Sequence, residues 1–396
     1  MKHHAFPPRQ SGFTLVELMV SMVIGMAIVL ALMTVTTRFE SGKRQNSSAN
    51  ALSLNVGYVA YDMDRIARSS GSGYLQSYKR TLGCTLNASR GGAQILPSPA
   101  AFPAPFSAVP QQVRMIPLLI HAGAGSGGSD VIAVVSGTSG VGEAAIGIKP
   151  GAAAAAQLGL LGTVGLRAND MVLLIESGKP CMLSQVASSY VFSSTSSLLP
   201  LGGTYYAATI NSKTVSDYGD GSVLNLGNAG DNPPQMMLYG LLGSDLMTYD
   251  LLQTGGSATP QLESSGVVDM RALYGVDNDD DGLVDTWVKP TAAGYTVAEL
   301  TDGSQNAQQH LARIRAVRLG MIMRTDRTEK TNVSPTSLKM FADLGAALTY
   351  SRALTANEQL EKMRVVETTI PLRNALLLPN KNTVPVDFKL ATQPTP

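Results

Sequence analysis

The sequence contains few of the residues from which metal centres and disulfide frameworks are built. Its 396 residues include only four histidines and two cysteines, Cys84 and Cys181. A zinc site of histidine and cysteine would need nearly all of those beyond the first dozen residues, and no closely spaced ligand pair supports one. The same shortage argues against a haem or an iron–sulfur cluster.

Charged side chains are also scarce. They make up 15% of the chain, and 30 basic residues are balanced by 29 acidic ones, which gives a formal net charge of +1. A chain so balanced has no excess positive charge to attract nucleic acid, so we expect no nucleic-acid partner. The 39 glycines and 21 prolines indicate a turn-rich chain, and its length allows two or three domains.

One long apolar run stands near the start of the sequence. Residues 18–37 carry no charge, and as a helix these 20 residues would extend roughly 30 Å, the thickness of a bilayer core. The run ends in threonines before Arg38 rather than in a site typical of signal-peptide cleavage. We therefore expect a membrane-spanning helix rather than a secretory signal peptide.

Glu17 is the unusual residue of this segment. A carboxylate at the centre of a membrane costs about 2.5–3.5 kcal/mol on insertion scales, so such a residue usually marks a function or a charged partner. Near the start of a helix the cost is lower, because the helix dipole favours an anion there. Glu17 is therefore either functional or an acidic residue that is tolerated near the membrane surface.

The residues around Glu17 resemble the processing and methylation motif of type IV prepilins: Gly12-Phe13-Thr14-Leu15-Val16-Glu17-Leu18. The resemblance implies that a membrane peptidase cuts after Gly12 and methylates the new amino terminus at Phe13. It implies that Glu17 pairs with the terminal amine of a neighbouring subunit during assembly, since two buried charges are tolerated when paired. It also implies a single-pass inner-membrane protein with a periplasmic head, which later joins a pilus on the cell surface.

Apolar residues continue after the membrane segment at spacings of three and four, which predicts an amphipathic helix to about Arg68; they include Leu52, Val56, Val59, Met63 and Ile66. The small residues 69–73 should end this helix. The expected division is therefore a leader peptide (1–12), a transmembrane and assembly helix (13–37), its amphipathic continuation (38–70) and a β-rich globular head (71–396).

Short apolar or β-branched runs between Gly, Asn, Asp and Ser clusters predict strands in the head. They lie at residues 113–120, 130–135, 171–175, 185–192, 236–239, 246–251, 316–323 and 365–372. Residues 151–162 have the pattern of a short helix or a packed loop, and residues 91–110 that of an irregular surface loop. The expected fold class is α+β: a pilin-like long N-terminal helix packed on a mostly antiparallel β-sheet head with long loops.

Several fragments of the head are similar to PilW-type minor pilins. They are Ser129-Asp130-Val131-Ile132, Val267-Val268-Asp269-Met270, Tyr274-Gly275-Val276-Asp277 and Thr368-Thr369-Ile370-Pro371-Leu372-Arg373-Asn374. The resemblance implies a minor pilin that primes or caps type IV pilus assembly at or near the tip, in support of twitching motility and adhesion. The implied partners are other minor and major pilins, the prepilin peptidase, the inner-membrane assembly platform and a pilus-tip adhesin.

A type IV pilin is not the only function class that the sequence suggests. A minor pseudopilin of a type II secretion system has the same kind of amino terminus and is the alternative function. A membrane-anchored periplasmic hydrolase is disfavoured, because no nucleophile–base pair is evident and His121 and His310 stand alone in the sequence. The glycines of residues 123–128 match a dinucleotide-binding pattern, but a strand rather than a helix should follow them. We expect a protein that is not an enzyme.

An acidic segment is the sharpest candidate site outside the amino terminus. Its carboxylates have the spacing of positions 1, 3, 5 and 9 of an EF-hand-type loop, with a main-chain carbonyl at position 7: Asp277, Asp279, Asp281, Asp285 and Leu283. Gly282 stands at position 6, where a sharp turn needs glycine, but Val288 replaces the usual glutamate at position 12. We expect a free-standing loop that binds Ca²⁺; the alternative is a solvated acidic turn.

The two cysteines would both lie outside the inner membrane in the implied orientation, where the compartment is oxidising. A disulfide between Cys84 and Cys181 would close a loop of about 100 residues, which the chain-entropy model values at up to roughly 4–5 kcal/mol. Sequence alone does not show that the two residues are close, so two unpaired buried thiols are the alternative.

Overall fold

The computed structural model describes residues 12, 14–140, 144–329 and 331–378. Its contacts divide the chain into two compact units, Met1–Leu54 and Asn55–Pro396. The helix α1 (Leu15–Ser69) begins in the first unit and ends in the second.

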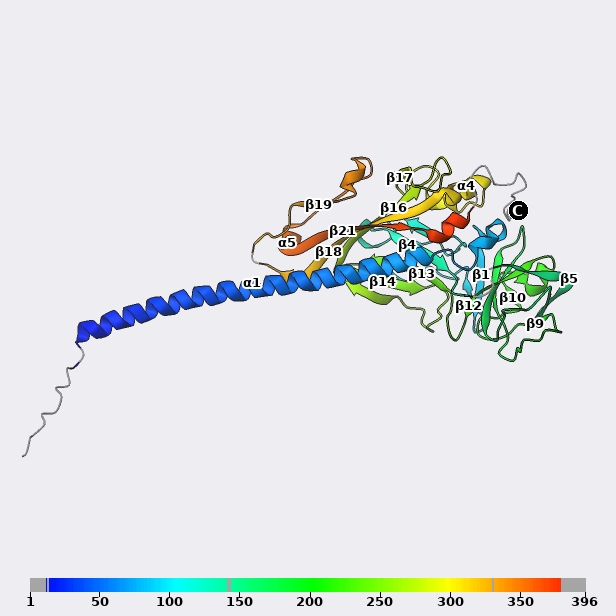
Figure 1. The fold of residues 1–396 in the computed structure, drawn as a ribbon, viewed down its shortest axis with the longest axis horizontal. Helices are drawn as coiled ribbons and strands as arrows, with labels where there is room; N and C mark the ends of the chain where they lie inside the picture. Colours follow the sequence, from blue (N-terminus) through cyan, green and yellow to red (C-terminus); the bar gives the residue numbers. More distant parts are fainter. Residues whose placement is uncertain (1–11, 13, 141–143, 330, 379–396) are drawn as a thin grey trace, which may run out of the picture. The chain divides into compact units, whose positions relative to one another are not determined.

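The first unit is the N-terminal part of α1, drawn in blue in Figure 1. Its residues Leu15–Glu40 form a helix that is long and apolar enough to cross a membrane, and none of its most apolar stretch is buried in the protein. Thr14 caps the start, because its hydroxyl oxygen accepts a hydrogen bond from the N–H of Glu17 at 3.3 Å. The membrane-length helix predicted from the sequence is therefore present, although it continues without a break.

The second unit begins with the last turns of α1, which bury one face. Val59, Met63, Ile66 and Ala67 are at most 5% exposed, at the spacing that the sequence predicts. The helix then gives way to a short turn, and Gly71 and Gly73 adopt positive φ angles of +79° that favour glycine. The predicted end of the helix at residues 69–73 is thus confirmed.

Two antiparallel sheets lie beside this helix segment. The first has the order β15 (Gln261–Ser265), β14 (Asp245–Asp250), β13 (Gln235–Leu242), β4 (Val131–Ser136), β3 (Leu118–His121). The second has the order β17 (Thr286–Val288), β16 (Val267–Val276), β18 (Ile314–Thr328), β21 (Glu361–Pro371). The side chain of Asn55 joins α1 to the first sheet through the carbonyl of Ser265 at 2.8 Å and the hydroxyl of Ser264 at 2.7 Å.

A third sheet closes on itself. Its order is β2 (Ala93–Leu96), β1 (Leu86–Arg90), β8 (Cys181–Gln185), β7 (Asp170–Ile175), β12 (Ser222–Asn228), β5 (Ile146–Ala154), β6 (Gln157–Leu160), β9 (Leu198–Pro200). An antiparallel bridge between Val186, just after β8, and Leu201, just after β9, joins the two ends of the six-strand series from β8 to β9. These six strands, which we call the barrel, enclose a cluster of buried residues that includes Leu158, Val172 and Val223.

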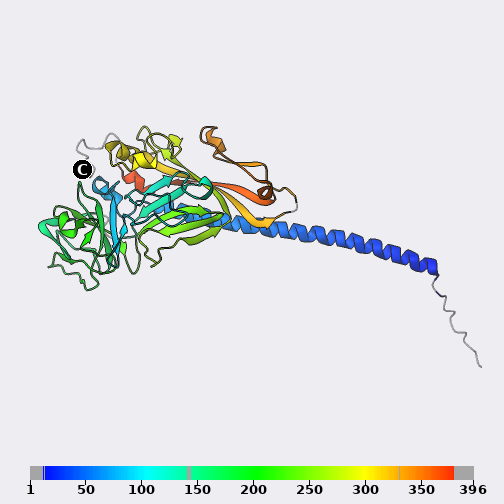
Figure 2. The same ribbon diagram turned by 180° about the vertical axis from the view of Figure 1, so that it is seen from behind.

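The barrel and the hairpin β19 (Ser337–Met340)–β20 (Tyr350–Ala353) lie at opposite ends of the second unit, as Figures 1 and 2 both show. The remaining elements are short: η1 (Leu75–Ser77), α2 (Tyr78–Thr81), η2 (Ser126–Gly128), β10 (Thr209–Ile210), β11 (Lys213–Thr214), η3 (Val215–Tyr218), α3 (Val297–Leu300), α4 (Gln305–Arg313), η4 (Ala342–Leu344), α5 (Ala356–Gln359) and η5 (Arg373–Leu377). Among the named strands of the described chain only β1 and β8 pair in parallel. The α+β, pilin-like arrangement expected from the sequence is confirmed.

Three local expectations were wrong at least in part. Residues 151–162 form the end of β5, a two-residue turn and β6 rather than a short helix or a packed loop, because pairing within the barrel overrides the helix preference of alanine. Residues 185–192 leave the sheet after Val186, and their Ser-rich sequence continues as turns. Residues 91–110 are irregular and largely exposed after β2, as expected, but the segment includes that strand and buries Phe102 and Phe106 against the ring of Tyr249.

Candidate functional site

The amino-terminal motif lies at the start of α1. A Cβ atom added at Gly12 would meet nothing within 4 Å, so the fold itself does not require glycine there. Glu17 is exposed in the first turn of the helix, where the dipole favours a carboxylate. Phe13 and the leader up to residue 11 lie outside the described residues, so the structure does not place the cleavage point.

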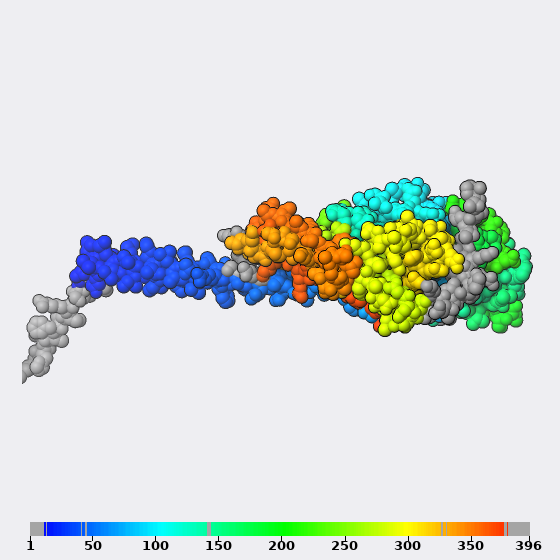
Figure 3. Space-filling view, turned by 90° about the horizontal axis from the view of Figure 1, so that it is seen from above, coloured from blue at the N-terminus to red at the C-terminus, as the bar shows by residue number. Residues whose placement is uncertain are grey.

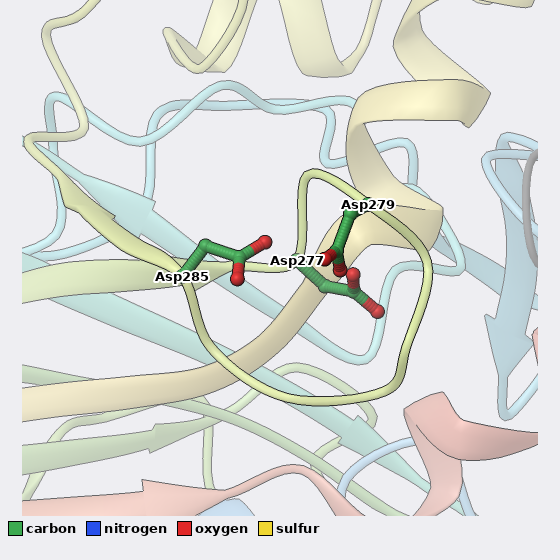
Figure 4. Close-up of side chains that lie close together, drawn as sticks. All are labelled: Asp277, Asp279 and Asp285. Carbon is green, nitrogen blue, oxygen red and sulfur yellow. The ribbon is translucent and has the colours of Figure 1, made fainter.

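The acidic loop, residues 277–285, connects β16 to β17. Carboxylate oxygens of Asp277, Asp279 and Asp285 lie within 4.8 Å of one another, and Figure 4 shows the three side chains around the loop. Gly282 has a φ of +90°, the left-handed region that favours glycine, as the loop pattern requires. The space-filling view in Figure 3 places the yellow segment that includes this loop on the surface of the second unit.

The structure does not bring every predicted ligand into this group. Asp281 is outside it, and its carboxylate accepts a hydrogen bond from the N–H of Leu283 at 2.7 Å. The side chain of Leu283 is 68% exposed. The described arrangement thus contains three of the four predicted carboxylates. Their ligand atoms are all oxygens, which a hard cation prefers.

Asp277 differs from the other aspartates of the group because it is fully buried and pairs with an arginine. Its carboxylate accepts hydrogen bonds from the N–H groups of Asp280 at 2.7 Å and Gly282 at 2.9 Å. The guanidinium of Arg315, only 4% exposed, donates to it at 3.1 Å. Burial alone would raise the pKa of Asp277, but these hydrogen bonds and the charge of Arg315 outweigh burial and lower it below its ordinary value.

Sequence reasoning missed Arg315 as the partner of Asp277. The arginine lies 38 positions later, in β18, and no short-range spacing connects the two residues. The only available signal was its position within a largely apolar run, where a charged residue that faces inward needs a counter-charge. Arg315 supplies one positive charge to the loop, so a bound cation would share Asp277 with it.

The other fragments that resemble PilW-type pilins also place polar side chains in long-range contacts. Asp130, 1% exposed, accepts hydrogen bonds from the N–H of Gly123 at 3.0 Å and of Ala272 at 2.9 Å. Burial raises the pKa of Asp130 despite these bonds. Asp269 pairs with Arg271 at 3.0 Å, and the guanidinium of Arg271 lies over the ring of Tyr350, 5.2 Å from its centroid.

The last of these fragments contacts the end of α1. The side-chain amide of Asn374 donates to the carbonyls of Ser69 at 3.3 Å and Ser70 at 2.9 Å. Ser69 is the last residue of α1 and Ser70 follows it, at the end where a helix leaves carbonyl groups without partners inside the helix. A residue from the far end of the sequence therefore caps the carboxyl end of α1.

The cysteines and histidines have structural surroundings. Cys84 and Cys181 form a disulfide in the structure, with their Cα atoms 5.7 Å apart, and so connect the start of β1 to the start of β8. His121 is buried in β3, and burial lowers its pKa to about 4, so the ring is neutral at pH 7. His310 packs edge-on against Tyr295, with ring centroids 4.8 Å apart.

Two further surface features lie on the barrel side of the second unit. A hollow of about 170 Å³ lies beside Asp170, but that carboxylate already accepts hydrogen bonds from Asn225, Asn228 and the N–H of Arg167. Several apolar side chains of the loop after β6, the loop before β9 and β9 itself are between 48% and 82% exposed; we call them the rim, and they are Leu161, Val164, Val191, Phe192 and Leu198.

Two protein-family models match the chain. Residues 7–33 match the prokaryotic N-terminal methylation motif, and residues 228–374 match the type IV pilus-assembly protein W, PilW. The chain carries a PilW domain behind a prepilin-type amino terminus. A search of curated proteins and a search of solved structures found no match.

The PilW domain runs from the end of β12 to Asn374, and it therefore contains the acidic loop, Arg315 and the cap of α1. Because PilW is a family of structural pilus proteins, the expectation that the chain is not an enzyme is confirmed. The barrel strands β5 to β9 precede the PilW domain.

Proposed function

We propose that the protein is a minor pilin that primes or caps type IV pilus assembly at or near the pilus tip. The observation that carries this proposal is the combination of the methylation motif at one end of the chain with a PilW domain at the other. The membrane-length segment of α1 supports insertion in the inner membrane with a periplasmic head, followed by incorporation into the pilus. In this proposal the chain divides into the leader 1–12, the helix parts 13–37 and 38–70, and the head 71–396.

Processing is the first step to test. Prepilin peptidase would cut after Gly12 and methylate Phe13, and a small residue before the cut lets the extended leader enter the peptidase. Because a Cβ at Gly12 meets nothing in the fold, Gly12→Val should fold and insert but remain unprocessed. N-terminal sequencing of the wild type should begin at Phe13, and a different first residue would overturn this step.

The role of Glu17 is tested by assembly. Glu17→Ala makes the helix more apolar, so insertion and cleavage should persist, while the pair with a neighbour's terminal amine is lost. We expect less of the variant in sheared pili and fewer pili in total, with Ser21→Ala as a neutral control on the same helix. Normal piliation and normal recovery of Glu17→Ala would contradict the proposal.

The proposed partners are other minor and major pilins, the inner-membrane assembly platform and a tip adhesin, with twitching motility and adhesion as the processes that depend on them. The alternative, a minor pseudopilin of a type II secretion system, has the same type of amino terminus. A pull-down from membranes separates them: minor pilins in the eluate support the proposal, and secretion pseudopilins support the alternative. In a deletion strain, loss of twitching motility with normal protein secretion would support the minor pilin over the pseudopilin.

We further propose that the acidic loop binds Ca²⁺. The supporting observation is the cluster of Asp277, Asp279 and Asp285, an all-oxygen donor set with the flexible geometry that Ca²⁺ accepts and Mg²⁺ does not. Without a glutamate at position 12 the dissociation constant should be on the order of 10⁻⁴–10⁻³ M. At tenfold excess, calcium should add about 1.4 kcal/mol to the stability of the folded chain.

The full chain in detergent should therefore melt at a higher temperature in millimolar calcium than in chelator. Asp279→Asn and Asp285→Asn should remove the difference, whereas Asp245→Asn, at the start of β14, should not. Calorimetry that detects no calcium binding, together with a melting temperature that ignores chelator, would show that the segment is a solvated acidic turn.

A further inference from the structure

Arg315 connects two segments of the second unit that are far apart in sequence. Its Nε donates to Asp277 at 3.1 Å, and its Nη1 donates to the main-chain carbonyl of Ala375 at 2.7 Å. The carbonyl of Arg315 accepts the N–H of Leu372 at 2.8 Å. One buried side chain thus holds the base of the acidic loop on one side and η5 on the other.

The segment held by Arg315 is the one that caps α1. Asn374 stands next to Ala375 and donates to the carbonyls of Ser69 and Ser70. The 3₁₀-helix η5 is short, so its position depends on external contacts rather than on its own hydrogen bonds. An unbroken series of polar contacts therefore runs from Asp277 through Arg315 and η5 to the end of α1.

We infer that Arg315 couples the acidic loop to the carboxyl end of α1, so that the contact with Asp277 determines how firmly η5 closes on that end. The guanidinium has a planar, fixed arrangement of donors, and Asp277 fixes its orientation through Nε while Nη1 reaches Ala375. Loss of the Asp277 contact frees the guanidinium to turn, and the hold on η5 weakens. Arg315 acts here as a positioning residue.

Hydrogen–deuterium exchange of the full chain in detergent micelles tests the coupling. Asp277→Asn should raise the exchange rates of peptides that cover residues 66–75 and 370–377 at least fivefold, although neither peptide touches Asp277. The matched control is Asp279→Asn, which removes the same charge from the same loop but is exposed. In the control, both peptides should exchange within twofold of the wild-type rates.

A second variant keeps the test decisive if Asp277→Asn does not fold. Arg315→Lys retains a cation for Asp277, but a single ammonium group cannot also hold Ala375 in the same way. Arg315→Lys should raise the exchange rates of residues 370–377 and 66–75, while the loop peptide 277–285 keeps its wild-type rate. Asn374→Ala should raise the exchange rate of residues 66–75 alone, because it removes only the last contact of the series.

The inference is overturned if Asp277→Asn speeds exchange in the loop and leaves both distant peptides at wild-type rates. It is also overturned if Arg315→Lys leaves residues 370–377 unchanged. These readouts do not depend on calcium or on pilus assembly, so they are independent of the function proposed above.

Discussion

The barrel and the PilW domain are stabilised in different ways. Residues 180–212, which include β8 and β9, contain no charged side chain. The barrel encloses a large apolar cluster, and its buried carboxylate, Asp170, is bound by amide groups rather than by an arginine side chain. In the PilW domain, by contrast, arginines pair with carboxylates across strands and loops; the pairs include Arg315–Asp277, Arg318–Glu367, Arg324–Glu361 and Arg352–Glu358.

This difference explains which region can be recognised from sequence. Apolar alternation builds many unrelated sheets, so the barrel strands carry little that is specific to one family. A buried carboxylate or amide needs one particular partner, so residues such as Asp130, Asp277 and Asn374 are harder to exchange. The fragments that resemble PilW pilins are the ones that contain these residues.

The largest effect should come from the disulfide on the barrel side. Replacing Cys84 and Cys181 together by serine removes a link across 97 positions, which should cost about 4–5 kcal/mol in the chain-entropy model. Urea unfolding of the full chain in detergent measures this loss. Trp287, the only tryptophan, lies in β17 of the PilW domain.

Fluorescence of Trp287 therefore shows whether the two regions unfold together. Because Asn55–Pro396 forms one compact unit, we expect fluorescence and circular dichroism to report the same midpoint in the wild type and in the cysteine variant. A separate transition seen by circular dichroism alone would show that the barrel unfolds independently. Mass spectrometry of the unreduced wild type should show the disulfide, and two alkylatable thiols would refute it.

A smaller loss should follow from Arg315→Met in the PilW domain. Removing one partner of a buried ion pair leaves the other charge without compensation, which should cost about 3–4 kcal/mol. We expect the low part of the usual range because Asp277 keeps its two amide hydrogen bonds. The double variant Asp277→Asn with Arg315→Met should recover part of the loss, and a loss equal to the sum of the single variants would contradict direct pairing.

The same pair predicts the response to acid. The pKa of Asp277 is lower in the folded protein than the value of about 3.9 in an unfolded chain. Its contribution to stability is therefore complete above the unfolded pKa and is lost as the pH falls through the folded pKa. Between pH 5 and 3 the unfolding free energy of Asp277→Asn should fall less steeply than that of the wild type, as measured by urea titration at each pH; parallel curves would contradict the sign of the shift.

The smallest effect should come from the rim of the barrel. Val191 is 82% exposed and Phe192 48% exposed, so their replacement by serine removes little buried area. The free energy of unfolding should change by no more than about 0.5 kcal/mol. Leu174→Ala, inside the same barrel, is the matched contrast and should cost about 2–5 kcal/mol. Equal losses at the two positions would show that the rim is buried in the folded protein.

The sequence predicts the helix and most strands because their signals are local. The helix is predicted by the helical spacing of Val59, Met63 and Ile66. The strands β4, β7 and β13 are predicted by their short apolar runs. Closure of the barrel depends instead on a bridge between Val186 and Leu201, and the cap on Ser69 and Ser70 comes from Asn374, 304 to 305 positions away. Such contacts are set by the folded topology, so no spacing in the sequence predicts them.

The same reasoning applies to the acidic loop. The positions of Asp277, Asp279 and Asp285 and the turn at Gly282 follow from the loop pattern. Asp281 instead accepts the N–H of Leu283 within the loop, and the pairing of Asp277 depends on β18, which carries Arg315. A pattern of ligands therefore indicates where a cation could bind but not which of the ligands already has a partner.

The cap by Asn374 also limits how early the head can finish folding. In the orientation proposed above, the chain enters the periplasm from its membrane anchor and exposes the end of α1 long before Asn374 has crossed, and β18 lacks its neighbour β21 until residue 361 follows. Until then β18 is an open edge that can pair with other chains. Completion of the head thus waits for the last part of the chain to be translocated, and premature stops before β21 should yield aggregates rather than shortened pilins.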